Sequence, residues 1–303
     1  MPWDGVFPAL TTQFHKDLTL DLDSTSGHIE RMIQSGVSGL VMLGSLGENN
    51  ALCREEKLEV IRAAVATSAG RVPVVSGVSE LSTPAACEYV RQAEAIGCDG
   101  FMVLPCMAYH SDRTETLAHY RQVAAACSSP IIVYNNPIAY KVDITPDMLE
   151  EMADCEQFFA VKESSGDTRR ITDIFNQVGN RYTIFSGVDD LALECTALGA
   201  TGWIAGIGLA FPEENQHLWN LMLAGKWEEA RELYRWYTPL LHLDVGNKFV
   251  QNIKLAIQEV GLGSEWVRMP RLPLSGEERE YVLTTVRKAV ANRPSLPESV
   301  GSK

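Results

Sequence analysis

The strongest constraint on the fold is a regular alternation of short apolar runs and longer helical stretches. Eight runs predict strands, at residues 5–14, 38–45, 72–78, 99–105, 130–135, 158–161, 181–187 and 201–206. Each run is followed by a stretch with helical spacing of its apolar residues. Eight such units in roughly 220 residues predict a parallel (β/α)8 TIM barrel, an α/β fold. A doubly wound open sheet is the alternative, but no G-x-G-x-x-G motif follows the first run.

The alternation stops after Gly225. Three helical stretches then follow one another without a strand between them, at residues 226–244, 249–263 and 275–290. We therefore predict two parts, a barrel with the active site at residues 1–224 and a C-terminal three-helix appendage at residues 225–303.

Composition narrows the function. The chain carries a formal net charge of -13, which argues against nucleic-acid partners and against anionic membrane surfaces. Its seven cysteines are scattered, with no C-x-x-C pair, as expected of reduced thiols in a cytoplasmic protein. The first residues contain no basic region before a long apolar run, so we predict no signal peptide and no membrane span.

Lys162 directly follows the sixth predicted strand, in the sequence FFAVKESSG. A lysine at the end of a buried strand is either paired with an acid or has a lowered pKa. In its neutral form such a lysine is a nucleophile that can form a Schiff base with a carbonyl group. The alternative is a structural ion pair between Lys162 and the adjacent Glu163.

The second predicted strand ends in the turn GSLGE, residues 44–48. In a barrel the functional groups lie at the carboxyl ends of the strands. A glycine-containing turn there can present backbone N–H groups to an anion, and Ser45 adds a hydroxyl. We predict a cradle for a substrate carboxylate made of Gly44, Ser45, Leu46 and Gly47. The alternative is a tight turn that merely requires glycine.

Three other strand ends supply candidate residues. Tyr134, in YNNP, is placed to move protons or to bind a substrate oxygen, although a core tyrosine is the plainer interpretation. Gly187 and Ile204, at the ends of the seventh and eighth strands, are predicted substrate contacts. Asp189 or Asp190, in SGVDD, is predicted to cap the following helix.

No group of His, Cys and Asp residues has the spacing of a metal site, and no G-x-S-x-G motif occurs. We therefore predict catalysis without a metal or a cofactor. Lys162 attacks the carbon of a small 2-oxo or 2-imino acid, the Ser45–Leu46 turn holds its carboxylate, and Tyr134 moves protons. The Schiff base then acts as an electron sink for loss of a proton from the neighbouring carbon.

The motifs GSLGE, YNNP, VKESSGD and SGVDD, in this order along nearly the whole chain, resemble the dihydrodipicolinate synthase / N-acetylneuraminate lyase superfamily. These proteins are class I Schiff-base lyases and aldolases. The resemblance implies that Lys162 is the Schiff-base lysine and that Tyr134 protonates and deprotonates the intermediate. Ser45 matches the first threonine of the family's G-T-T-G-E turn, whereas Leu46 replaces the second. The resemblance also implies a homotetramer.

Two departures bear on the substrate. The synthases of this superfamily have an arginine two residues after the YNxP proline, where this chain has Ala139. They also have a tyrosine after the fourth strand that reaches a neighbouring subunit, where this chain has Cys106 and Met107, with Tyr109 two residues later. Both departures argue against condensation of pyruvate with aspartate semialdehyde.

The segments WDGVFPALTTQF, VYNNP, KESSGDTRR and ELYRWYTPLLHLD look most like 1-pyrroline-4-hydroxy-2-carboxylate deaminases of bacterial hydroxyproline breakdown. This resemblance implies conversion of that compound to 2,5-dioxopentanoate and ammonia. The alternatives are a 2-keto-3-deoxy sugar-acid dehydratase, a pyruvate-releasing aldolase and a 4-hydroxy-tetrahydrodipicolinate synthase. A non-catalytic 2-oxo-acid binding protein is a further alternative, which Leu46 and Ala139 favour.

Overall fold

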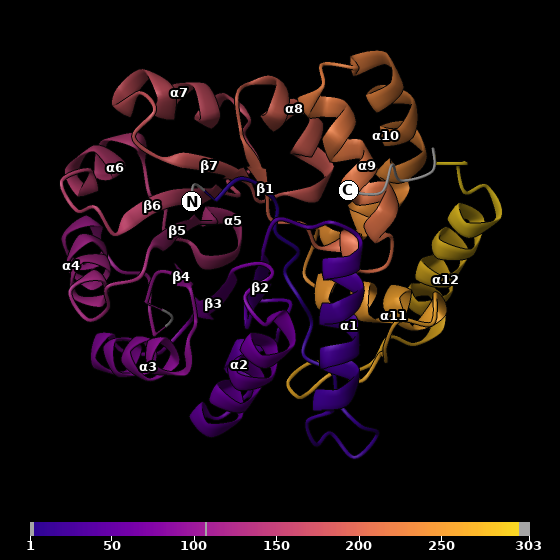
Figure 1. The fold of residues 1–303 in the computed structure, drawn as a ribbon, viewed down its shortest axis with the longest axis horizontal. Helices are drawn as coiled ribbons and strands as arrows, with labels where there is room; N and C mark the ends of the chain where they lie inside the picture. The colour runs from indigo at the N-terminus through magenta and orange to yellow at the C-terminus, as the bar shows by residue number, and fades with distance from the viewer. Residues whose placement is uncertain (1–2, 107, 297–303) are drawn as a thin grey trace.

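The computed structural model describes residues 3–106 and 108–296, in which eight parallel strands form one sheet (Figure 1). The strands are β1 (Gly5–Val6), β2 (Leu40–Met42), β3 (Val74–Val78), β4 (Gly100–Val103), β5 (Ile131–Asn135), β6 (Phe158–Glu163), β7 (Thr183–Ser186) and β8 (Gly202–Trp203). Their order is β1-β8-β7-β6-β5-β4-β3-β2. A parallel bridge between Ala9 and Val41 closes the sheet between β1 and β2. The predicted (β/α)8 barrel is confirmed.

The first strand is shorter than residues 5–14. Of residues 5–14, only Gly5 and Val6 form a regular strand, which pairs with β8. The pairing with β2 is limited to backbone bonds of Val41, whose N–H donates to the Pro8 carbonyl and whose carbonyl accepts from the Leu10 N–H. Beyond Leu10 the chain leaves the sheet. The Thr12 hydroxyl donates to the Gly47 carbonyl, and the Gln13 side chain accepts a bond from the Ser264 N–H in the C-terminal part.

Helices alternate with the strands around the outside of the barrel (Figure 1). They are α1 (Leu22–Gln34), α2 (Arg54–Ser68), α3 (Thr83–Ile96), α4 (Arg113–Ala124), α5 (Pro137–Tyr140), α6 (Pro146–Met152), α7 (Arg169–Val178), α8 (Ala192–Ala197) and α9 (Pro212–Leu223). Short 3-10 helices are η1 (Asn49–Ala51), η2 (Asp189–Leu191), η3 (Ile207–Leu209) and η4 (His242–Asp244). Within the described residues, no helix has both the length and the apolar character to cross a membrane.

Helix α5 was not predicted. It forms a single turn after β5 because Pro137 suits the first helical position and the Asn136 side chain accepts a hydrogen bond from the Ala139 N–H at 3.0 Å. This turn brings Tyr140 back over the end of the barrel, where it becomes part of the candidate site.

The register between β5 and β6 places the two principal candidate residues side by side. Tyr134 pairs with Lys162, and the next pair is Asn135 with Glu163. Since side chains alternate between the faces of a strand, Tyr134 and Lys162 share one face and Asn135 and Glu163 share the other. The lysine and the tyrosine therefore lie together at the carboxyl end of the barrel.

The C-terminal part consists of α10 (Trp227–Leu241), α11 (Phe249–Glu259) and α12 (Gly276–Ala291), coloured orange to yellow at one side of the barrel (Figure 1). The three predicted helices are present. Their apolar side chains, among them Tyr237 and Ile253, belong to the same continuous cluster of buried residues as the barrel strands. The division of the chain at residue 224 stays a prediction.

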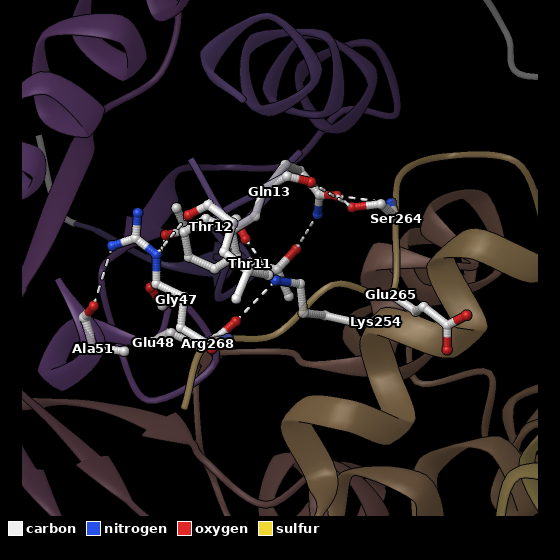
Figure 2. A network of polar contacts seen from close by, with 12 residues as sticks. Thr11, Thr12, Gln13, Gly47, Glu48, Ala51, Lys254, Ser264, Glu265 and Arg268 are labelled. Carbon is white, nitrogen blue, oxygen red and sulfur yellow. Dashed lines mark hydrogen bonds and ion pairs between the residues drawn. The ribbon is translucent and has the colours of Figure 1, made fainter. Parts of the chain in front are cut away.

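A buried ion pair ties α11 to the carboxyl ends of the first two strands (Figure 2). Lys254 donates to Glu48 Oε1 and to the Thr12 carbonyl, both at 2.8 Å, and lies 4.4 Å from the centre of the Phe14 ring. Glu48 Oε2 accepts a bond from the Arg268 N–H at 2.9 Å. Neither charged side chain of the pair is exposed. Each charge therefore depends on the other to offset the free-energy cost of its removal from water.

We predict that Lys254→Met lowers the free energy of unfolding by about 3–5 kcal/mol, because it leaves the Glu48 carboxylate buried without its cation. Urea unfolding followed by tryptophan fluorescence measures this change. The matched control is Lys248→Met, which breaks the exposed pair with Glu278 and is expected to have little effect. Equal losses in both variants would contradict the assigned role of the buried pair.

Candidate active site

Lys162 lies at the end of β6 and is only 7% exposed. Its Nζ atom is 4.2 Å from the centre of the Tyr134 ring. Burial lowers the pKa of Lys162, and the negative charges of Asp244, Tyr140 and Asp189 oppose that shift in this order. A lysine in such surroundings is populated as the neutral amine closer to neutral pH than an exposed lysine, as a Schiff-base nucleophile requires.

The alternative of a structural Lys162–Glu163 ion pair is wrong. Glu163 faces the other side of β6, where its carboxylate accepts bonds from Asn135 Nδ2 at 2.9 Å and from the Ser165 N–H. Burial raises the pKa of Glu163. The alternation of a β-strand separates the two neighbouring side chains, so Lys162 is left free for chemistry.

Two tyrosines and a serine line the site beside Lys162. The Tyr134 hydroxyl accepts a bond from Asn136 Nδ2 at 3.1 Å, and burial raises its pKa. The Tyr140 ring meets the Tyr134 ring edge to face, with centres 5.7 Å apart, and its hydroxyl is bonded to Ser45 Oγ. The three predicted residues thus lie together, joined by Tyr140, which the sequence did not indicate because α5 was not foreseen.

The GSLGE turn follows β2 and leads into η1. The Leu46 side chain is buried in the apolar core, so its contribution to a cradle is limited to its backbone. A Cβ atom on Gly47 would lie 2.8 Å from Leu43 Cα, so glycine is required there. Among the described residues, no group accepts a hydrogen bond from the N–H of Ser45 or Leu46. These two N–H groups are available for a carboxylate, and Gly44 precedes them in the turn.

Gly187 lies against the candidate nucleophile. A Cβ atom on Gly187 would lie 2.7 Å from Cγ and 2.8 Å from Cε of Lys162, and 2.1 Å from Ser164 Oγ. Its N–H donates to the Glu163 carbonyl at 2.9 Å. Ile204 is buried directly after β8, with its N–H bonded to Ser186. Direct contact of Gly187 and Ile204 with substrate stays a prediction. The lack of a side chain at Gly187 leaves room for the stem of Lys162.

The prediction that Asp189 or Asp190 caps the following helix is wrong, since no side chain caps η2 or α8. Asp189 is completely buried and accepts bonds from Trp203 Nε1 at 3.0 Å and from the N–H groups of Gly206 and Ile207. Burial raises its pKa to about 6. Local sequence could not reveal these donors, because they lie in and just after β8, 14 to 18 residues further along the chain. In residues 3–106 and 108–296, no three metal-binding side chains gather around one point.

Asp244 is a second acidic group at this site that sequence analysis missed. It belongs to η4, between α10 and α11, in a stretch assigned to the appendage. Burial raises its pKa strongly, the neighbouring Asp189 adds to this rise, and Lys162 opposes it. No motif around Asp244 could have revealed its position, because only the packing of η4 on the barrel brings it there.

The segment after β4 carries the predicted departures. Cys106 lies there with its thiol close to the Leu81 carbonyl, and Met107 lies outside the described residues. Tyr109 is exposed. The tyrosine bonded to the Ser45 hydroxyl is Tyr140, which follows β5. Within one chain, Tyr140 is the second tyrosine of the site.

Comparison with known proteins identifies the family. The sequence matches the family described as "Dihydrodipicolinate synthetase family" over residues 2–289. The chain belongs to this family. The resemblance inferred from the motifs is confirmed, and family membership makes the protein a TIM-barrel Schiff-base lyase.

Relatives of the family match over nearly their full lengths. The 4-hydroxy-tetrahydrodipicolinate synthase of Phenylobacterium zucineum is 33% identical over 288 residues, 94% of this chain and 97% of the relative. That of Sorangium cellulosum is 34% identical over 301 residues, 97% and 98% respectively. The dihydrodipicolinate synthase of Acinetobacter baumannii, solved with pyruvate, superposes with a TM-score of 0.91 at 25% identity, covering 95% of this chain and 99% of the other.

We predict that Gly187→Ala reduces Schiff-base formation by about 100-fold, because the added methyl displaces the stem of Lys162. Borohydride reduction in the presence of pyruvate, a small 2-oxo acid, traps the adduct. Protein mass spectrometry then measures its amount. Gly27→Ala in α1 is the control, since nothing lies within 4 Å of its added Cβ. Undiminished adduct in Gly187→Ala would show that the lysine does not need this space.

The lowered pKa of Lys162 predicts how its reactivity varies with pH. As pH rises the ammonium loses its proton, and only the neutral amine reacts, so reactivity rises through a midpoint below the ordinary value of 10.5. Acetylation by acetic anhydride over a range of pH, quantified by peptide mass spectrometry, measures this midpoint. Exposed Lys16 in the same samples normalises for decay of the reagent. A midpoint at or above 10.5 would contradict the inferred effect of burial.

Proposed function

We propose that the protein is a Schiff-base-forming deaminase that converts 1-pyrroline-4-hydroxy-2-carboxylate to 2,5-dioxopentanoate and ammonia. The observation that carries this proposal is the charge around the nucleophile. The side chain that acts most strongly on Lys162 is the carboxyl of Asp244, and no arginine follows the YNNP turn. Such a site suits a substrate with one carboxylate and a basic nitrogen.

A 4-hydroxy-tetrahydrodipicolinate synthase is the second candidate. The names of the relatives support it more directly than they support the deaminase. The charges at the site argue the other way. Ala139 is exposed and has no cation to offer a second carboxylate. The two arginines after β6 are already engaged, Arg169 with Asp167 and Arg170 with Asp143.

The proposed reaction begins with attack of Lys162 Nζ on C2 of the cyclic imine, which opens the ring by transimination. Loss of a proton from C3 gives an enamine that expels the C4 hydroxyl as water. Migration of the double bond toward C5 produces a second imine, whose hydrolysis releases ammonia. Hydrolysis at Lys162 then frees 2,5-dioxopentanoate and regenerates the amine. Overall, one substrate molecule and one water molecule give the two products.

Other residues have distinct tasks in this scheme. The N–H groups of Ser45 and Leu46 hold the carboxylate, because neither is used within the described chain. Tyr134, whose ring centre lies 4.2 Å from Lys162 Nζ, exchanges protons with the carbon skeleton. Tyr140, bonded to Ser45, continues the path of hydroxyl groups toward the partly exposed edge of the site.

The remaining alternatives share the Schiff base and differ in product. A 2-keto-3-deoxy sugar-acid dehydratase releases water without ammonia, whereas an aldolase releases pyruvate. A non-catalytic binding protein would not be labelled covalently by borohydride. The product released from each substrate therefore distinguishes these possibilities.

We also propose a homotetramer located in the cytoplasm. The tetramer is supported by the resemblance to the superfamily, and the location by seven cysteines that are all free. The aromatic residues of α10 do not add support, because Trp236 and Tyr237 stack on each other at 5.6 Å within the C-terminal part. Light scattering on the purified protein determines the number of subunits.

We predict that the wild type releases ammonia from 1-pyrroline-4-hydroxy-2-carboxylate and that Lys162→Ala lowers this rate by about 1,000-fold or more. A coupled ammonia assay measures the rate, and circular dichroism verifies that the variant is folded. Wild-type protein that forms an adduct with pyruvate but releases no ammonia would refute the deaminase. Consumption of pyruvate with aspartate semialdehyde would then establish the second candidate.

A further inference from the structure

The carboxyl group of Asp244 is a polar group of the site that the mechanism above does not use. Its Oδ1 atom is buried and has no hydrogen-bond partner among the described residues. A buried carboxyl oxygen without a partner is costly, so its retention calls for a ligand or a reaction that uses it. The residue reaches the barrel from η4, outside the strand–helix repeat.

The neighbouring Asp189 differs from Asp244 in this respect. Three donors satisfy Asp189, namely Trp203 Nε1 and the N–H groups of Gly206 and Ile207. Asp189 therefore fixes the turn after β8 and has little capacity left for a substrate. Of the two acids that act on Lys162, only Asp244 retains a free acceptor.

Packing holds the Asp244 carboxyl over the end of β8. A Cβ atom on Gly206 would lie 2.5 Å from Oδ1 and 2.7 Å from Cγ of Asp244, so only a glycine permits this approach. Tyr134 comes from β5, on one side of β6, whereas Gly206 follows β8, on the other side. The nucleophile on β6 thus has hydroxyl groups on one flank and a carboxyl on the other.

We propose that Asp244 is a catalytic residue that transfers the protons of Lys162 Nζ to the ring nitrogen of a cyclic 2-imino acid during transimination. The inference rests on the proposed function in taking such an imine as the substrate. It adds a residue that selects for nitrogen in the substrate, which neither Tyr134 nor Ser45 provides.

The proton balance of transimination fits a single carboxyl. Nζ forms a bond to C2 while the C=N π electrons move to the ring nitrogen, which takes one proton from Asp244. The Asp244 carboxylate then receives a proton from Nζ and passes it to the same nitrogen as the bond between C2 and the ring nitrogen breaks. The second proton of Nζ then returns to the Asp244 carboxylate and restores its protonated form. In net terms two hydrogens leave Nζ and two arrive on the substrate nitrogen, Asp244 is unchanged, C2 becomes bonded to Nζ as the new imine, and no co-reactant is needed.

Two probes test this assignment in the intact protein. 1-Pyrroline-2-carboxylate carries the ring nitrogen but lacks the hydroxyl that must leave, and pyruvate carries no nitrogen. Cyanoborohydride reduction followed by protein mass spectrometry gives the rate of adduct formation with each probe. The wild type is expected to react with both, and the mass of the first adduct reports ring opening because the primary amine is retained.

Asp244→Asn is expected to slow adduct formation with 1-pyrroline-2-carboxylate by about 100-fold and to leave adduct formation with pyruvate nearly unchanged. Asp190→Asn is the matched control. It removes an acid at the same edge whose carboxylate pairs with His242 at 3.2 Å, and it is expected to affect neither probe. Equal losses for both probes in Asp244→Asn, or no loss for either, would overturn the assignment.

The ammonia assay separates this inference from the proposed function. A wild type that releases no ammonia but reacts with 1-pyrroline-2-carboxylate through Asp244 would keep the inference and discard the deaminase. Release of ammonia at an unchanged rate by Asp244→Asn would keep the deaminase and discard the inference.

Discussion

The site depends on the register between β5 and β6 in a closed parallel sheet. Pairing of Tyr134 with Lys162 puts the amine 4.2 Å from the aromatic ring and leaves Glu163 on the opposite face. A shift by one residue would move Lys162 to the face of the sheet that Glu163 now occupies, away from Tyr134. Closure of the sheet fixes the register on every strand, so the geometry of the nucleophile is a property of the whole barrel.

Burial of this nucleophile is supported from outside the barrel. The C-terminal part supplies Asp244, packed against Gly206 after β8, and Lys254, bonded to Glu48 in the turn that contains Ser45. The Lys254–Glu48 pair links α11 to the chain after β1 and to the turn after β2. A buried charge reduces stability unless it is paired. Glu48 is paired with Lys254, whereas Asp244 at the site has an oxygen without a partner among the described residues.

Family membership and substrate choice rest on different residues. The barrel is shared with members of the family that match over nearly their whole length. In the proposed function, Ala139, Tyr140 and Asp244 are the residues that set the charge and the hydroxyl groups offered to the substrate. A fold that leaves its strand ends free to vary can keep one covalent step and change the chemistry that follows it.

The sequence by itself determined the eight strand–helix units, because apolar periodicity is a local property, and it singled out Lys162, Tyr134 and Ser45 through their positions at strand ends. It misjudged Asp189, whose hydrogen-bond donors lie in and just after β8, and it missed Tyr140, which depends on an unexpected turn of helix. Asp244 lay in a segment assigned to the appendage. Only the tertiary structure could place these groups, because electrostatic and hydrogen-bonding partners are chosen by distance in space and not by spacing along the chain.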